Sequence, residues 1–134
     1  MILNFLSRYR DLGLLVLRLG LGAMFIAHGG PKLMGGPERW AALGKAMGNF
    51  GIDYAHTFWG FMAAFAEAGG GVLLMLGLFT RPACFLLLAT MVVAARHHLV
   101  KGDGLMGASH PIESAIVFLS LIFIGPGRYS IDGE

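Results

Sequence analysis

A small set of ionisable side chains interrupts the long apolar stretches of this sequence, and chemistry is most plausible there. The set consists of Arg18, His28, Glu67, Arg96, His97 and Glu113. Carboxylates can exchange protons, and neutral imidazoles can donate hydrogen bonds, relay protons or bind metal ions. Because the two arginines can balance the two glutamates, the histidines can stay neutral. This combination is typical of a site that binds a polar ligand or handles protons.

Glu67 is the most informative member of the set, because it lies deep inside an apolar stretch. Ala63, Glu67 and Gly71 are spaced four apart, which places Glu67 on the small-residue face where helices pack closely. A charge at the centre of a bilayer costs about 2.5 to 3.5 kcal/mol on insertion scales. We therefore expect Glu67 to face the protein interior, to find a partner there and to serve a function.

The composition shows which solvent surrounds these residues. Hydrophobic residues make up 56% of the 134 residues and charged residues only 13%, against about 25% charged in a typical soluble domain. The mean hydropathy is +0.69. Lysines and arginines are scattered singly, which argues against a nucleic-acid partner. One cysteine, Cys84, leaves no intramolecular disulfide and no multi-cysteine metal site. The sequence predicts a multi-pass integral membrane protein, with the lipid bilayer as its surroundings.

The elements that position the polar set are four predicted membrane spans. A spanning helix needs about 20 residues, and the apolar stretches predict spans at about 12–28, 57–80, 82–100 and 111–125. The fold class is therefore all-α, an antiparallel four-helix transmembrane bundle. We call the surface that holds both chain termini the near side and the opposite surface the far side. At about 1.5 Å per residue, all members of the set except Arg18 fall in the far half.

The longest connection, between the first two spans, contains a further predicted helix. Pro37 can start it, and Trp40, Leu43, Met47 and Phe50 recur at helical spacing on one face. Such a short amphipathic helix suits the membrane interface, with the indole ring at headgroup depth. A lid packed on the mouth of the bundle is an equally good interpretation, and the two do not exclude each other.

Each polar residue also has a purely structural interpretation. Arg18 can extend toward the near side or brace the bundle through backbone carbonyls. His28 and His97 can be ordinary interface histidines, and we interpret His98 and His110 as loop or rim residues. The sequence contains no nucleophile elbow, phosphate-binding glycine loop or paired-histidine zinc motif.

The sequence resembles the DoxX family of small four-helix membrane proteins over nearly its whole length. The stretches that carry the resemblance are Leu17 to Gly22, Phe25, His28-Gly29, Lys32-Leu33, Glu67 with the glycines after it, Gly77 to Pro82 and Gly125 to Asp132. The resemblance implies a recurrent polar set of Arg18, His28, Lys32, Glu67 and Arg81. It also implies a place beside quinone-linked oxidoreductases, because the family includes subunits of such complexes.

Four functions remain open at this point. We favour a redox or quinone-linked membrane protein whose ligand contacts Arg18, His28, Lys32, Glu67, Arg96, His97 and Glu113. The second hypothesis is a non-catalytic scaffold that recruits a soluble oxidoreductase or a membrane partner, and a homo-oligomer or membrane oxidoreductase subunits are the partners that we expect. The third is a metal or haem site on His28 and His97, and the fourth is transport of protons or a small solute.

Overall fold

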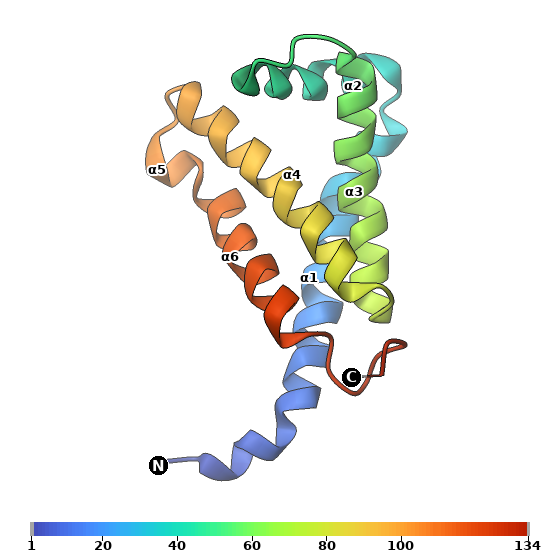
Figure 1. Cartoon of the computed structure of the whole chain (residues 1–134), viewed down its shortest axis with the longest axis vertical. Helices are drawn as coiled ribbons and strands as arrows, with labels where there is room; N and C mark the ends of the chain where they lie inside the picture. The colour runs from blue at the N-terminus through green and yellow to red at the C-terminus, as the bar shows by residue number, and fades with distance from the viewer. Residues whose placement is uncertain (1, 134) are drawn as a thin grey trace.

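The computed structural model of the chain describes residues 2–133, and its regular elements are all helical within that range. The order along the chain is η1 (Asn4–Tyr9), α1 (Arg10–Met34), α2 (Pro37–Gly44), η2 (Lys45–Phe50), α3 (His56–Leu76), α4 (Thr80–Val100), α5 (Gly104–Gly107) and α6 (Ser109–Ile124), with η1 and η2 of the 3-10 type. Figure 1 shows α1, α3, α4 and α6 running along the long axis, while η2 crosses the far end. The predicted all-α class is confirmed.

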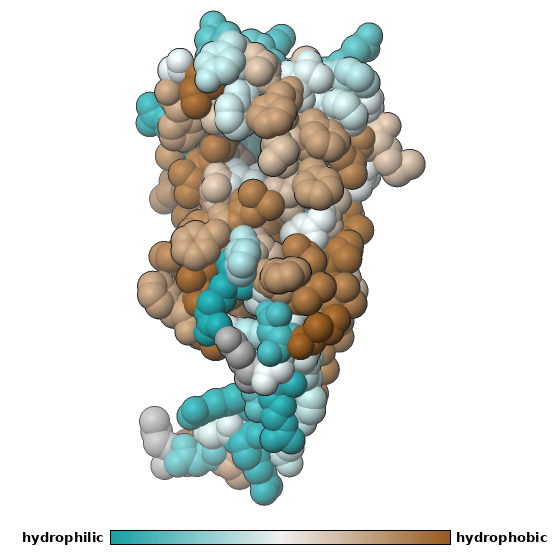
Figure 2. All heavy atoms as spheres, turned by 45° about the vertical axis from the view of Figure 1, so that its right-hand side comes forward, coloured by the Kyte–Doolittle hydropathy of each residue, from teal (hydrophilic) through white to brown (hydrophobic). Residues whose placement is uncertain are grey.

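Three segments of the described chain are long and apolar enough to cross a membrane: Asn4–Met34, His56–Leu76 and Thr80–Val100. The remaining long helix, α6, is apolar but shorter. Figure 2 shows a broad hydrophobic band, with hydrophilic residues gathered toward the two ends. Large apolar side chains such as Phe85 and Phe123 are 60% and 79% exposed, as expected where lipid replaces water. The chain is therefore a membrane protein that contacts the bilayer.

Helix α1 continues beyond the predicted end of the first span at residue 28 and stops only at Met34. The sequence Gly29-Gly30-Pro31 predicts a helix end, but tertiary contacts carry the helix through it. A Cβ on Gly29 would lie 2.5 Å from the Ala68 nitrogen, so α1 and α3 touch backbone to backbone here. Beyond this contact, the Trp40 indole donates to the carbonyls of Lys32 and Leu33 and so satisfies the last turn.

The helix predicted from Pro37 is present, but its α-helical part ends at Gly44 and the 3-10 helix η2 follows from Lys45. Two glycines seat α2 directly on α3. A Cβ on Gly44 would overlap the His56 carbonyl, and one on Gly60 would overlap the Trp40 carbonyl. The connection therefore packs against the far end of α3.

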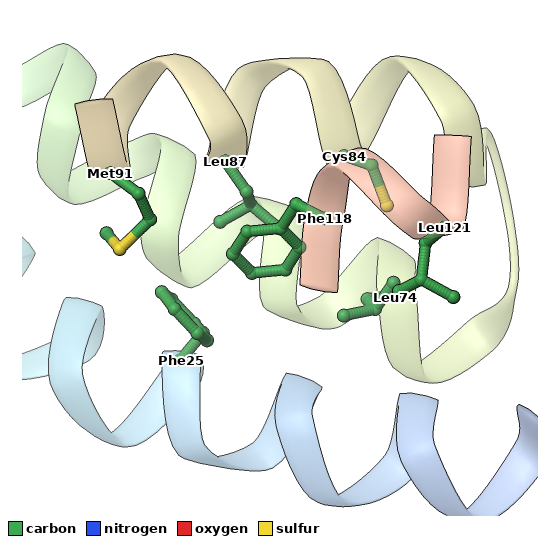
Figure 3. Packing of buried hydrophobic residues seen from close by; sticks show 7 residues of the cluster. All are labelled: Phe25, Leu74, Cys84, Leu87, Met91, Phe118 and Leu121. Carbon is green, nitrogen blue, oxygen red and sulfur yellow. The ribbon is translucent and has the colours of Figure 1, made fainter. Parts of the chain in front are cut away.

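The core lies between all four long helices. Phe25 of α1, Leu74 of α3 and Phe118 of α6 meet the α4 side chains, as Figure 3 shows. The members of this cluster are Phe25, Leu74, Cys84, Leu87, Met91, Phe118 and Leu121. Backbone packing joins α1 to α3, α3 to α4 and α4 to α6, but no Cα atom of α6 comes within 8 Å of one in α1. The bundle is therefore less tightly closed between α1 and α6, where only side chains bridge the helices.

Candidate functional site

A cavity of about 120 Å³ lies in the far half, where the four long helices meet above the core. It is lined by Phe25, His28, Lys32, Glu67, Met91, Ala94, His98, His110 and Pro111. These residues come from α1, α3, α4 and α6. The cavity combines an aromatic wall with ionisable groups inside an otherwise apolar molecule.

Lys32 and Glu67 form an ion pair at the wall of this cavity. The Lys32 Nζ atom donates to both carboxylate oxygens of Glu67, at 3.1 Å each. The Glu67 side chain is only 7% exposed, and the close approach of Gly29 brings α1 near enough for the contact. Removing one partner of a buried ion pair costs about 3 to 5 kcal/mol, because the other charge is left uncompensated. The prediction that Glu67 lies on the packed face is confirmed.

Three imidazoles complete the cavity wall. The His28 and His110 rings are 5.4 Å apart between centroids, and His110 stacks on Phe25 at 6.2 Å. His98 Nδ1 lies 2.6 Å from the Asp103 carboxylate. The pKa of Asp103 is lowered, first by this hydrogen bond from His98 and further by the nearby charge of Lys101. If Nδ1 carries the shared proton, Asp103 orients the ring and leaves His98 Nε2 for a ligand.

Other residues of the predicted set lie outside this cavity. His97 Nδ1 lies 3.2 Å from Asn49 Nδ2, and Arg96 Nε donates to the Asn49 carbonyl at 3.1 Å. These contacts fasten η2 to the end of α4, and His97 does not line the cavity with His28. Glu113 is exposed on α6. Within residues 2–133, no three His, Cys, Asp or Glu side chains are grouped as a metal site requires.

Sequence reasoning assigned His98 and His110 to loops or the rim, whereas both line the cavity. One signal could have identified His98. Cys84, Leu87 and Met91 are buried on one face of α4, and helical spacing carries that face through Ala94 to His98 rather than to His97. His110 precedes Pro111 at the start of α6, and only the tertiary fold brings it to His28.

Arg18 is fully buried near the other end of the molecule, where it binds four backbone carbonyls. Its Nε atom donates to Pro126 at 2.9 Å, and Nη2 donates to Tyr129. Nη1 donates to Leu74 and Met75, at 3.3 and 3.2 Å, in the last turn of α3. A guanidinium at this helix end also complements the negative pole of the helix dipole. Arg18 thus braces the bundle through carbonyls, as one of the two structural interpretations predicts.

The C-terminal tail completes this arrangement by capping α4. The carboxylate of Asp132 accepts hydrogen bonds from the backbone N–H groups of Phe79 and Thr80, both at 3.0 Å. The N–H groups of Ile131 and Asp132 donate to Leu76 and Gly77. The pKa of Asp132 is lowered, chiefly by the hydrogen bond from Thr80. The motifs at Gly77 to Pro82 and Gly125 to Asp132 therefore fasten the near end of the fold.

Comparisons with known proteins agree with this architecture. The DoxX family model matches residues 13–100. An uncharacterised protein of Haemophilus influenzae is 30% identical over 98% of this chain and 97% of its own length. The inner membrane protein YphA of Escherichia coli is 30% identical over 93% of this chain and 96% of its own length. No solved structure matches the chain significantly. With its apolar helices, the chain is a multi-pass protein of the bacterial inner membrane, and it belongs to the DoxX family.

Proposed function

We propose that the cavity of Phe25, Lys32, Glu67 and the three imidazoles binds the head of a membrane quinone or a quinone-like amphiphile. The observation that carries this proposal is the cavity itself, where hydrogen-bond donors and an aromatic ring meet in the interior of a membrane protein. Ligand sites are commonly apolar hollows with a few convergent polar groups. The family resemblance to quinone-linked proteins supports the same assignment.

Size and access both suit an amphiphile with one ring in its head. An engineered apolar cavity of about 150 Å³ holds benzene, and the cavity of about 120 Å³ is of that order. His28 and His110 are exposed beside the side of the bundle where α1 and α6 lack backbone contact. A head entering there keeps its apolar tail in lipid.

The donors match the carbonyl acceptors of a quinone. Lys32 has three N–H groups and gives two hydrogen bonds to Glu67. Imidazole N–H groups of His28 and His110 can reach a second carbonyl, while Phe25 stacks on the ring. Reduction of a quinone needs two electrons and two protons. The two protons can reach the ring oxygens from outside through the exposed imidazoles of His28 and His110, and a partner oxidoreductase subunit must supply the two electrons.

Fluorescence quenching tests the assignment directly. Trp40 donates to the carbonyl of Lys32, so a quinone in the cavity lies near its indole. We expect a short-chain benzoquinone to quench the fluorescence of the detergent-solubilised protein saturably. His110→Ala removes a hydrogen bond of about 1 kcal/mol and a stacking surface, and should weaken binding about tenfold. Glu67→Gln should also weaken it.

His56→Ala is the matched control, because His56 pairs with exposed Asp53 outside the cavity. It should bind with the affinity of the unmodified protein. Quenching that does not saturate, or equal affinities for His110→Ala and His56→Ala, would exclude the cavity as a quinone site. The Lys32–Glu67 pair would then have another role, of which helix packing, as in the scaffold hypothesis, is one.

A further inference from the structure

A second hollow lies at the near end of the molecule, and it suggests a ligand site that is independent of the proposed quinone site. It has a volume of about 290 Å³ and lies between η1, the start of α1 and the C-terminal tail, lined by Arg8, Tyr9, Asp11, Leu12, Arg128 and Tyr129. Figure 1 shows the N-terminal segment leaving the bundle at the end where the tail also lies. The two termini of the chain therefore build one local feature.

The walls of this hollow are held in place by the fold. The Arg128 N–H donates to Asp11 Oδ1 at 3.1 Å, which ties the tail to the first turn of α1. A Cβ on Gly127 would lie 3.1 Å from the Leu14 side chain, so the tail backbone runs close against α1. The carbonyl of Tyr129 is bound by buried Arg18. The tail is thus fixed from both sides before any ligand arrives.

The charges at this hollow favour an anion. Arg8 lies over the Tyr9 ring at 5.3 Å, and Arg128 lies over the Tyr129 ring at 5.5 Å. Across the described chain, neither guanidinium has a carboxylate at ion-pair distance. Asp11 also faces the hollow, but its carboxylate accepts the Arg128 backbone N–H. Two arginines against one carboxylate leave a net positive site for a phosphate.

We propose that this hollow binds the phosphate of an anionic phospholipid. The rest of the lining favours a lipid over a free anion, because Leu12, Tyr9 and Tyr129 are each about half exposed. Tyrosine is enriched at membrane interfaces, where its ring meets both lipid and water. Basic pockets beside membrane helices bind anionic headgroups. The phosphate lies between the two guanidiniums, and the lipid chains follow the apolar surface of α1.

Lipid retention by the full-length protein tests this site. The protein is purified in detergent, mixed with equal phosphatidylglycerol and phosphatidylcholine, and weighed intact by native mass spectrometry. We expect preferential retention of phosphatidylglycerol. Arg8→Gln with Arg128→Gln should reduce the preference about 30-fold, since each basic residue near a membrane surface contributes about a factor of five. Both side chains are exposed, and the Arg128 contact to Asp11 uses the backbone, so the fold should survive.

The matched control carries Arg39→Gln and Lys101→Gln, which remove the same charge from exposed far-side positions. It should keep the preference, whereas equal loss in both double variants would show only a dependence on net charge and overturn the site. Arg8→Gln alone should give an intermediate loss. Retention of phosphatidylglycerol by the Arg8/Arg128 variant at the unmodified level would also overturn it. Competition by millimolar inorganic phosphate would assign the hollow to a free anion instead of a lipid.

Discussion

Arg18 concentrates the hydrogen bonding of the near end in one side chain. Its four carbonyl acceptors belong to the last turn of α3 and to the C-terminal tail. In an apolar environment such acceptors have no water to replace a lost donor. One side chain thereby joins segments that are far apart in the sequence.

Replacing Arg18 with methionine should therefore destabilise the protein strongly. Methionine fills much of the same space but donates nothing, and several buried carbonyls lose their partner. We expect a loss of about 3 kcal/mol in the free energy of unfolding, measured by circular dichroism in detergent. Arg10→Met at an exposed position of α1 is the control. Equal stabilities of the two variants would show that the carbonyl contacts contribute nothing.

Asp132 makes the near end sensitive to acid. Because its pKa is lowered in the folded state, mainly by the Thr80 N–H, the charged cap stabilises the fold above the unfolded-state pKa of about 3.9. That stabilisation is lost as the pH falls through the lower folded-state pKa. Asp132→Asn cannot titrate, and it should lower stability at neutral pH by about 1 kcal/mol, the usual value of an N-terminal cap.

The measurement is Tm against pH for the unmodified protein and Asp132→Asn. The gap between the two curves should be constant at neutral pH and should close below about pH 4. A gap that persists to pH 2 would mean that the carboxylate charge is not what stabilises the end of α4.

The key residues of the cavity and of the near end differ in how well the sequence predicts their positions. The interior position of Glu67 follows from its small-residue spacing, and the structure confirms it. The partners of Arg18 leave no sequence signal, because any residue can offer a carbonyl. Only the family resemblance identified Lys32 as a candidate site residue. Its ion pair with Glu67 depends on α1 extending past Pro31, which the sequence pattern does not predict.

At the scale of elements, the α1–α3 contact decides whether the cavity exists. Gly29 and Gly30 are neighbours on α1, yet a Cβ on Gly29 would clash with the backbone of Glu67 and Ala68, whereas one on Gly30 meets nothing within 4 Å. An alanine at position 29 therefore tests the close packing of the helices, whereas an alanine at position 30 tests helix propensity alone.

Gly29→Ala should push α1 away from α3 and cost about 1 to 3 kcal/mol. It should also weaken quinone binding, because Lys32 moves away from Glu67. Gly30→Ala should leave binding unchanged and stabilise the helix by about 0.5 to 1 kcal/mol. Unfolding in detergent and the quenching titration measure both effects. A Gly29→Ala protein with full stability and full binding would contradict the close contact.

Helix positions follow well from the apolar stretches, but helix ends do not. The pattern predicts most of α3 and α4, but it extends the second span to residue 80, whereas α3 ends at Leu76 and Thr80-Arg81 already form the first turn of α4. It fails at the end of α1, where glycine and proline signal a stop that the Trp40 and Gly29 contacts override. The pattern also selected His97 instead of His98 as a ligand-binding residue. An apolar helix in lipid shows little difference in polarity between its buried and exposed faces, so the sequence does not indicate which histidine points inward.

At the scale of the whole molecule, side chains of the core connect all four long helices, whereas the backbones of α1 and α6 do not come into contact. Neither the absence of backbone contact nor the meeting of His28 with His110 follows from local patterns, because both depend on how α4 and α6 diverge from α1 and α3 (Figure 1). This arrangement leaves a cavity in the far half next to the packed core.

Cys84 reports whether that core opens as a unit. The thiol is fully buried and belongs to a cluster with Leu74, Phe118 and Leu121 of two other helices, so a reagent reaches it only when those helices separate. With an unfolding free energy of at least about 5 kcal/mol, labelling by a maleimide should be at least about a thousandfold slower than in denatured protein. Ala42→Cys, at an exposed position of α2, should add one rapidly labelled thiol and leave Cys84 slow.

Arg18→Met should speed the labelling of Cys84, because loosening the near end lowers the free energy of global opening. Rapid labelling of Cys84 in the folded protein would show that α4 separates from the core without global unfolding.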